Sequence, residues 1–157
     1  MKKIKKTLTA LIAIILISTL GSFSPSTKPG VPLAIIVNKD NPVASMSAGE
    51  VKLYWLRKIK SRWPAINKNI RPVDRKTHCI EQETFYSRIL SMNNDEVETY
   101  FVTKQYQNAQ KPQDKFVNDK DIIDFVGDEI GAIGYVNMSS MSAEAKAKVK
   151  VVFTVSN

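Results

Sequence analysis

The chain has 157 residues, of which 43% are hydrophobic and 24% charged, and its formal net charge is +8. This composition is typical of one ordinary globular domain and excludes a collagen-like fibre. The single cysteine, Cys79, excludes an intrachain disulfide framework and a cysteine-rich zinc site.

The first 21 residues have the pattern of a secretory signal peptide. Four lysines lie within residues 1–6, and the apolar run from Leu8 to Leu20 follows them. At 13 residues this run is shorter than the roughly 20 needed to span a membrane. Small residues near Gly21 suit cleavage, and no cysteine follows for lipid attachment. We expect a periplasmic or secreted protein without a stable membrane anchor; the alternative is an uncleaved anchor.

Charge is unevenly distributed along the rest of the chain. Without the four signal lysines, 19 basic residues remain against 15 acidic ones, a net charge of +4. Residues 52–76 hold nine basic residues and one acidic residue, which leaves the other residues at −4. Such segregation suits an anionic partner, although a solvated basic face is the simpler interpretation.

Residues 22–32 are rich in Ser, Pro and Gly and predict a flexible leader, so the domain is expected at 33–157. In the first half of the domain the patterns predict a buried strand at 33–37, a helix at 48–58 capped by Ser47, a strand at 70–73 and a helix capped by Thr77 that reaches Met92. Two further helices follow: one is capped by Asn93 or Asn94, and the other is begun by Asn118 or Asp119 and ended by Gly127. The chain then has a predicted strand at 131–136, a helical turn at 143–148 and a strand at 149–155.

The order of these elements predicts the fold class. Strands alternate with helices and long crossovers, which is typical of an α/β fold. We therefore expect a single domain with a mixed, mostly parallel sheet flanked by helices. The sequence shows no internal repeat.

Residues able to perform catalysis are scarce. His78 is the only histidine, and no G-x-S-x-G turn is present. Cys79 follows His78 directly, and adjacent residues on a helix point about 100° apart, so the two do not form a dyad. One His and one Cys leave only scattered carboxylates for a metal. The sequence thus predicts a protein that is not an enzyme and holds no cofactor or metal.

Residues 71–79 predict a strand end that runs into a helix start. The first N–H groups of a helix bind phosphate or sulfate readily. Arg75 adds a guanidinium and Thr77 a hydroxyl, so Arg75, Thr77, His78 and Cys79 are the candidate oxyanion-binding residues. In the alternative, Thr77 only caps its helix, His78 is exposed and Cys79 is a packing residue.

A second alternative concerns the charge of Arg75, which could pair with a neighbouring carboxylate instead of a ligand. Asp74 and Glu81 are close enough in sequence to do so.

Several ordered motifs resemble the phosphate-transporter solute-binding proteins, members of the periplasmic binding protein superfamily. The resemblance covers about Leu33 to Val155. The motifs are Leu33 to Pro42 with V-N-x-x-N-P, Ser47 to Arg57, Trp63-Pro64, Pro72 to Arg75, Phe85-Tyr86, Lys111-Pro112 and G-A-I-G-Y-V at Gly131 to Val136.

The resemblance implies a non-enzymatic lobe that binds phosphate or a similar oxyanion at an arginine followed by a Ser-Gly-Thr helix start. Arg75 matches the arginine, and Thr77-His78-Cys79 stands where that pattern has Ser-Gly-Thr. Family members close a second lobe over the ligand, whereas this chain has room for one. The second wall would come from a dimer or a partner, with an ABC transporter permease as a further partner. Tyr54, Trp55 and Trp63 are candidate interface residues, and the core is the alternative location for Trp55.

Two rival functions remain open at this point. The lobe could have lost its ligand and act as an interaction or sensory accessory module in the cell envelope. Alternatively, residues 52–76 could attach to anionic lipid or nucleic acid, since basic and aromatic residues interleave there. The signal peptide argues against nucleic acid as a partner.

Overall fold

The computed structural model describes residues 30–58, 62–109, 111 and 113–156. In chain order the elements are β1 (Leu33–Asn38), α1 (Ala48–Trp55), β2 (Arg71–Arg75), α2 (Ile80–Phe85), the π-helical turn η1 (Tyr86–Leu90), α3 (Asn94–Asn108), β3 (Asp114–Phe116), α4 (Asp119–Asp128), β4 (Ala132–Asn137), the 3-10 turn η2 (Met138–Ser140), α5 (Ala143–Lys148) and β5 (Val149–Val155). The expected signal peptide and residues 22–29 of the leader lie outside the described residues.

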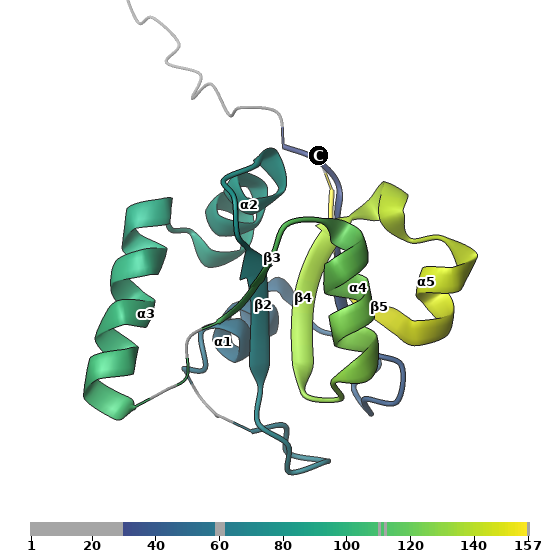
Figure 1. Cartoon of the computed structure of the whole chain (residues 1–157), viewed down its shortest axis with the longest axis horizontal. Helices are drawn as coiled ribbons and strands as arrows, with labels where there is room; N and C mark the ends of the chain where they lie inside the picture. Colours follow the sequence, from purple (N-terminus) through teal and green to yellow (C-terminus); the bar gives the residue numbers. More distant parts are fainter. Residues whose placement is uncertain (1–29, 59–61, 110, 112, 157) are drawn as a thin grey trace, which may run out of the picture.

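The strands form one sheet in the order β3-β2-β4-β1-β5 (Figure 1). β2 pairs in parallel with β3 and β4, whereas β1 pairs antiparallel with β4 and β5. Four strands therefore share one direction and β1 runs against them. This arrangement confirms the predicted mixed, mostly parallel α/β sheet.

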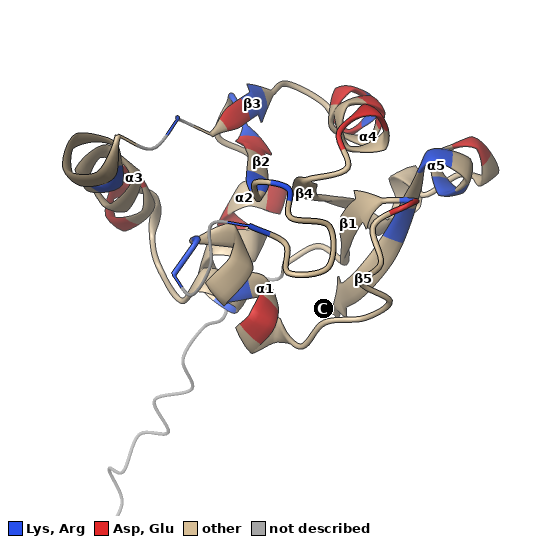
Figure 2. Ribbon diagram, turned by 90° about the horizontal axis from the view of Figure 1, so that it is seen from below, with Lys and Arg blue, Asp and Glu red and all other residues tan. Residues whose placement is uncertain are grey.

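Alternate residues of β1 supply the cores on the two faces of the sheet. Leu33, Ile35 and Val37 belong to the cluster that α1, α2 and α3 cover, whereas Ala34 and Ile36 belong to the cluster under α4 and α5. Successive strand side chains point to opposite faces, so a strand buried on both sides is apolar throughout. Figure 2 shows α4 and α5 on one side of the sheet and α1 on the other.

Local capping chemistry sets most helix starts. Ser47 and Asn93 form the capping boxes of α1 and α3, and Asn118 accepts a hydrogen bond from the α4 backbone. The predicted cap Thr77 is wrong, because α2 begins only at Ile80, after a bend at Lys76 and Thr77. The predicted end of α4 at Gly127 is one residue early.

Trp63, expected as an interface residue, is buried instead. Its Nε1 donates a hydrogen bond of 2.9 Å to the carbonyl oxygen of Gly131, and its ring stacks on Tyr54 at 4.9 Å between centroids. A buried indole needs such an acceptor for its N–H group. The contact ties the turn before β2 to the start of β4, and it corrects the expectation of an exposed aromatic surface at Trp63.

Candidate functional site

The carboxyl ends of β2 and β4 lie side by side in the sheet, because the two strands pair in parallel at Arg71 with Ala132. β2 leads to α2, β4 leads to η2, and the neighbouring β3 leads to α4. We call this end of the sheet the carboxyl edge. Ligands of open α/β sheets bind outside the carboxyl ends of the strands.

The two ends of the described domain also lie at the carboxyl edge. Leu33, the first residue of β1, pairs with Asn137 at the end of β4 and with Val155 at the end of β5. Figure 1 shows the start of β1 and the C-terminus beside each other, on the same side of the molecule as α2. The described part of the chain therefore begins and ends beside the candidate site.

Arg75, the last residue of β2, places its guanidinium at this edge. Only 5% of the residue is exposed. Its Nη2 forms an ion pair with Asp119 Oδ1 at the first position of α4, and its Cζ lies 5.8 Å from the centroid of the Tyr135 ring. Its Nε is buried and has no hydrogen-bond acceptor among the described residues. The positive charge is therefore compensated from within the domain.

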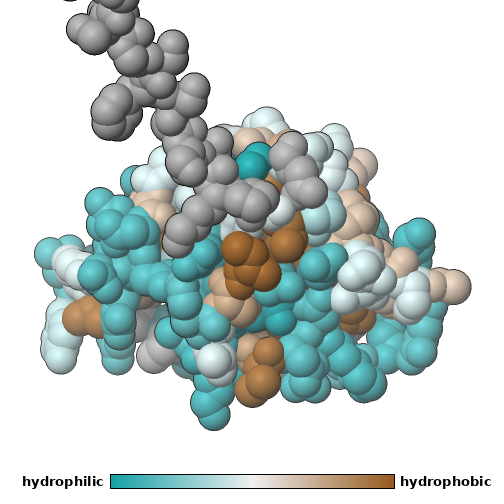
Figure 3. Space-filling view, turned by 90° about the horizontal axis from the view of Figure 1, so that it is seen from above, coloured by the Kyte–Doolittle hydropathy of each residue, from teal (hydrophilic) through white to brown (hydrophobic). Residues whose placement is uncertain are grey.

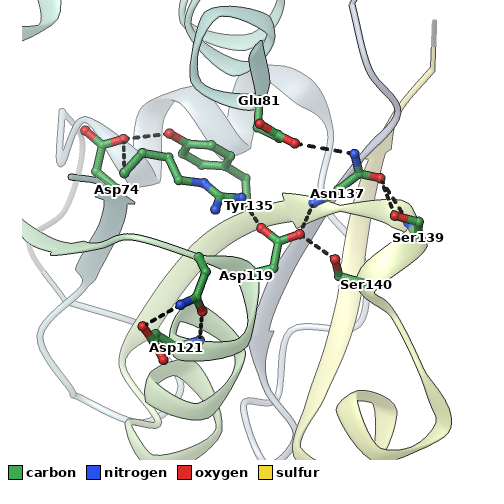
Figure 4. Close-up of polar contacts among 10 residues, drawn as sticks. Asp74, Glu81, Asp119, Asp121, Tyr135, Asn137, Ser139 and Ser140 are labelled. Carbon is green, nitrogen blue, oxygen red and sulfur yellow. Dashed lines mark hydrogen bonds and ion pairs between the residues drawn. The ribbon is translucent and has the colours of Figure 1, made fainter. Parts of the chain in front are cut away.

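Asp119 accepts hydrogen bonds from three groups that converge on its carboxylate (Figure 4). Besides Arg75, the backbone N–H of Asn137 donates to Oδ2 at 3.0 Å, and the hydroxyl of Ser140 donates to the same oxygen. A position in the first turn of a helix further favours a carboxylate. A guanidinium, an amide and a hydroxyl are also the donors that bind a free oxyanion. We call these three donors the Asp119 cradle.

Glu81 brings a second carboxylate to the carboxyl edge from the first turn of α2. The side-chain amide of Asn137 donates a hydrogen bond of 3.5 Å to it. Burial alone would raise the pKa of Glu81, but hydrogen bonds from its own amide, Cys79 and Asn137 hold that pKa below its usual value. The edge therefore carries two charged carboxylates beside one buried guanidinium, which disfavours a further anion.

The other three predicted site residues have different surroundings. Thr77 and His78 are exposed and Cys79 is half-buried. His78 Nε2 lies 2.9 Å from Glu83 Oε1, and Nδ1 lies 2.6 Å from Asn94 Nδ2, so the ring faces the start of α3. Burial raises the pKa of the Cys79 thiol, which keeps it protonated and unreactive at neutral pH.

The backbone N–H groups of Thr77, His78 and Cys79 were predicted to donate hydrogen bonds to an oxyanion. None of them donates a hydrogen bond to an acceptor within the described part of the chain. Cys79 is the N-cap of α2 and has no side-chain cap bond. Binding of an oxyanion by these three groups stays a prediction.

Asp74 forms the buried support beneath the site. Its carboxylate accepts hydrogen bonds from the hydroxyl groups of Tyr86 and Tyr135, each at 2.6 Å, from Gln82 Nε2 at 3.3 Å and from the N–H of Arg75 at 2.8 Å. Burial, with the nearby Asp74 charge, raises the pKa of both tyrosines. This network joins β2, η1 and β4, so it fixes the end of β2 from which Arg75 projects.

Sequence reasoning missed Asp119, Asn137 and Ser140, and it offered Asp74 or Glu81 only as alternative partners of Arg75. Asp119 lies 44 positions beyond Arg75, and only the parallel pairing of β3 with β2 brings α4 to this edge. A signal was available for two of the three: Asn137 ends a strand and Asp119 begins a helix, where polar side chains reach the carboxyl edge, whereas Ser140 ends the turn η2.

Two arginines of the basic segment 52–76, Arg71 and Arg75, are paired with carboxylates from elsewhere in the chain. Arg71 forms ion pairs with Asp114 at 2.9 Å and Glu129 at 2.5 Å, and Arg75 pairs with Asp119. Figure 2 shows basic and acidic residues next to each other on β2 and β3. Carboxylates from elsewhere in the chain thus neutralise part of the segment, which weakens the case for attachment to lipid or nucleic acid.

Within the described residues, no cluster of three His, Cys, Asp or Glu side chains is arranged to hold a metal ion. In the same part of the chain, no helix has the length and apolarity required to cross a bilayer.

Comparison with known proteins identifies the fold through solved structures. No known family model matches the chain, and no curated protein matches its sequence. Structural similarity extends to a protein from Clostridium perfringens described as a phosphate ABC transporter substrate-binding protein with bound phosphate, at 19% identity and a TM-score of 0.55. An ABC-type phosphate transport receptor from Vibrio cholerae gives 19% identity and a TM-score of 0.58. A possible phosphate-binding protein from Planctomyces limnophilus gives 17% and 0.55.

The match covers 78% of this chain but only 45%, 46% and 41% of the three neighbours. The chain therefore spans less than half the length of these solved structures. At this level of identity the comparison shows the fold: the domain has the architecture of one lobe of a periplasmic binding protein. The neighbours are binding proteins rather than enzymes, and they support a solute-binding fold.

Proposed function

We propose that the protein is an exported, non-enzymatic solute-binding protein related to phosphate-transporter receptors, and that it binds phosphate or a similar oxyanion at the carboxyl edge. The observation that carries the proposal is the set of donors gathered there. The Asp119 cradle supplies a guanidinium, an amide and a hydroxyl, and Thr77 to Cys79 add uncommitted N–H groups. The fold shared with phosphate receptors supports this choice of ligand.

Binding to the isolated lobe should be weak. Asp119 occupies the donors that an incoming anion needs, and Glu81 adds negative charge beside them. An open face also leaves each exposed charge pair worth only about 0–1 kcal/mol, because water competes for the same groups. We expect dissociation constants in roughly the millimolar range, about −4 kcal/mol of binding free energy.

A second wall over the carboxyl edge would strengthen binding by excluding water. Two large aliphatic side chains border this edge and are exposed: Ile80, which begins α2, at 40%, and Val117, which precedes the α4 cap, at 62%. Exposed aliphatic residues beside a polar site are typical of an interface. We propose that a dimer or a partner lobe supplies this wall, and that an ABC transporter permease is a further partner.

Titration calorimetry of the purified protein with phosphate and with sulfate tests the ligand. Ser140→Ala removes one donor of the cradle, and Ser139→Ala is the matched control, since the Ser139 hydroxyl donates its hydrogen bond to Asn137 Oδ1 instead of Asp119. We expect saturable heat in the wild type and in the control, with weaker binding in Ser140→Ala. Absence of both heat and thermal stabilisation at tens of millimolar phosphate would remove the proposal.

The Arg75–Asp119 pair supports a second candidate function. Because the guanidinium is already neutralised within the domain, the lobe could serve as a protein-interaction or sensory accessory module of the cell envelope. Pull-down from envelope extract in phosphate-free buffer distinguishes the two. A stable, stoichiometric partner that is indifferent to phosphate favours the module, and a partner that binds only with phosphate favours the receptor.

Export is the remaining part of the proposal. We propose that residues 1–21 are removed near Gly21 and that the product is released to the periplasm or medium without a membrane anchor. Because an exported protein is separated from the nucleic acids of the cell, we propose no nucleic-acid partner. N-terminal sequencing of the protein from fractionated cells tests this. A mature form beginning near residue 22 in the soluble envelope fraction agrees, and an intact chain in the membrane fraction does not.

A further inference from the structure

A cavity of about 380 Å³ lies on the α3 side of β2 and β3 and shares one wall residue, Arg75, with the Asp119 cradle. Its wall is formed by the end of β2, by α2, η1 and α3, and by residues around β3. Figure 1 shows α3 standing beside the open edge of the sheet that β3 forms. The volume falls within the range of roughly 300–1,000 Å³ found for small-molecule sites.

The strand wall of this cavity gathers cationic and donor groups. Asp74 pairs in register with Lys115, and Lys76 follows Asp74 by two positions, so all three side chains begin on the same face of the sheet. Neither Lys76 nor Lys115 forms an ion pair with any described residue. Both line the cavity. They bring two ammonium groups without an ion-pair partner to a wall that the Asp74 carboxylate also lines.

Gln113 provides the most direct sign of a missing ligand. It lines the same cavity just before β3, and its Nε2 is buried without a hydrogen-bond acceptor among the described residues. A buried amide that lacks an acceptor is destabilising. An oxygen atom of a bound molecule would satisfy it. The nearby Asp74 carboxylate does not, since its hydrogen bonds come from Tyr86, Tyr135, Gln82 and the Arg75 N–H.

The helix wall opposite is partly apolar. Val97, Phe101 and Val102 of α3 line it, and Val102 is 45% exposed although it lies beside the cavity. Glu98 is the one carboxylate of α3 in this wall, and it disfavours an anionic group on that side. A ligand that satisfies both walls therefore has an oxyanion head toward the strands and an apolar body toward the helix.

We propose that this cavity binds a small organic anion, with its oxyanion head at Lys76, Lys115 and Gln113 and its apolar body against α3. The cavity shares Arg75 with the Asp119 cradle, but the Arg75 Nη2 is directed to Asp119 in α4, so the proposed head group meets Lys76, Lys115 and Gln113 instead. Inorganic phosphate has no apolar body and should not occupy the cavity. Phenyl phosphate and benzoate combine both parts and are suitable probes.

Titration of the ¹⁵N-labelled protein by NMR tests this site. We expect phenyl phosphate or benzoate to shift the Gln113 side-chain amide and the backbone of Lys115 and Val102 in a saturable manner. Benzyl alcohol lacks the charged head. Its dissociation constant, measured from the same shifts, should be at least roughly ten-fold higher, which corresponds to a loss of about 1.4 kcal/mol of binding free energy.

Variants separate this site from the one proposed above. The double variant Lys115→Ala, Gln113→Ala should weaken phenyl phosphate binding by roughly ten-fold or more, and Lys120→Ala, an exposed lysine on α4, should not. Ser140→Ala should weaken inorganic phosphate alone. The inference is overturned if neither probe gives saturable shifts at 10 mM (about −2.7 kcal/mol), if the shifts map to Asn137 and Ser140, or if the double variant binds like the wild type.

Discussion

Replacing Tyr135 by Phe removes a single hydroxyl group from beneath the candidate site. That hydroxyl donates a 2.6 Å hydrogen bond to the buried carboxylate of Asp74. The ring itself stays stacked on Phe85, with centroids 4.2 Å apart and planes 8° from parallel, so packing is preserved. A hydrogen bond to a charged group contributes about 1.5–3 kcal/mol. We expect the free energy of unfolding to fall by that amount.

Urea unfolding followed by tryptophan fluorescence measures this loss. Tyr100→Phe is the matched control, because its hydroxyl donates to an uncharged acceptor, the carbonyl oxygen of Leu56, at 2.7 Å. The control should lose only about 0.5–1.5 kcal/mol. A loss below about 0.5 kcal/mol in Tyr135→Phe, or one no larger than in the control, would refute the role of the Asp74 network.

The same network predicts a pH dependence. The pKa of Tyr135 in the folded protein lies well above the ordinary value of 10.0 because of burial and the Asp74 charge. Above pH 10 the unfolded chain releases this proton and the folded chain keeps it, so stability falls as pH rises. Unfolding free energies measured from pH 9 to 11 should decline less steeply in Tyr135→Phe than in the wild type, and parallel curves would contradict this.

Two further predictions concern backbone packing and surface charge. Gly131→Ala should lower the free energy of unfolding by at least about 1–3 kcal/mol, because the new Cβ would clash with the backbone carbonyl oxygen of Asn69. Gly49→Ala in α1, where the Cβ would make only an ordinary contact with Ser47 Oγ at 4.0 Å, should be neutral or stabilising in the same urea assay. The pKa of Asp124, held at about 2 by hydrogen bonds from Lys120 and Lys148, should rise toward 3.8 in Lys148→Ala when followed by NMR, and an unchanged value would show that the ion pair does not form in solution.

Local chemistry explains which elements the sequence could predict. Ser47, Asn93 and Asn118 make their cap contacts within three residues, and β1 is a continuous apolar run. β3 escaped prediction because its three residues, Asp114–Phe116, include only one apolar side chain. It becomes a strand by pairing with β2, which local sequence does not encode.

The candidate site required tertiary information for the same reason. Arg75 was identified from its position at the end of a strand, but its partner Asp119 depends on the placement of α4. Thr77 resembled a helix cap, yet Cys79 occupies that position because α2 begins only at Ile80. Because α2 begins at Ile80, the Gln82 side chain lies within hydrogen-bond distance of Asp74. Contacts between segments far apart in the sequence therefore determine which polar residues meet at the carboxyl edge.

Phosphate titration of the Asp119→Ala variant addresses the Asp119 cradle most directly. Removing the carboxylate vacates the donors of Arg75, Asn137 and Ser140 and leaves a buried cation uncompensated, which costs about 3–5 kcal/mol of stability. Phosphate should restore part of that stability and bind roughly ten-fold or more tightly than to the wild type.

The double variant Arg75→Ala, Asp119→Ala is the control, since it removes both charges of the buried pair. It should fold without the stability defect and show no phosphate response. If Asp119→Ala folds and binds phosphate no better than the wild type, or if the double variant responds equally, the donors around Asp119 are not an oxyanion site.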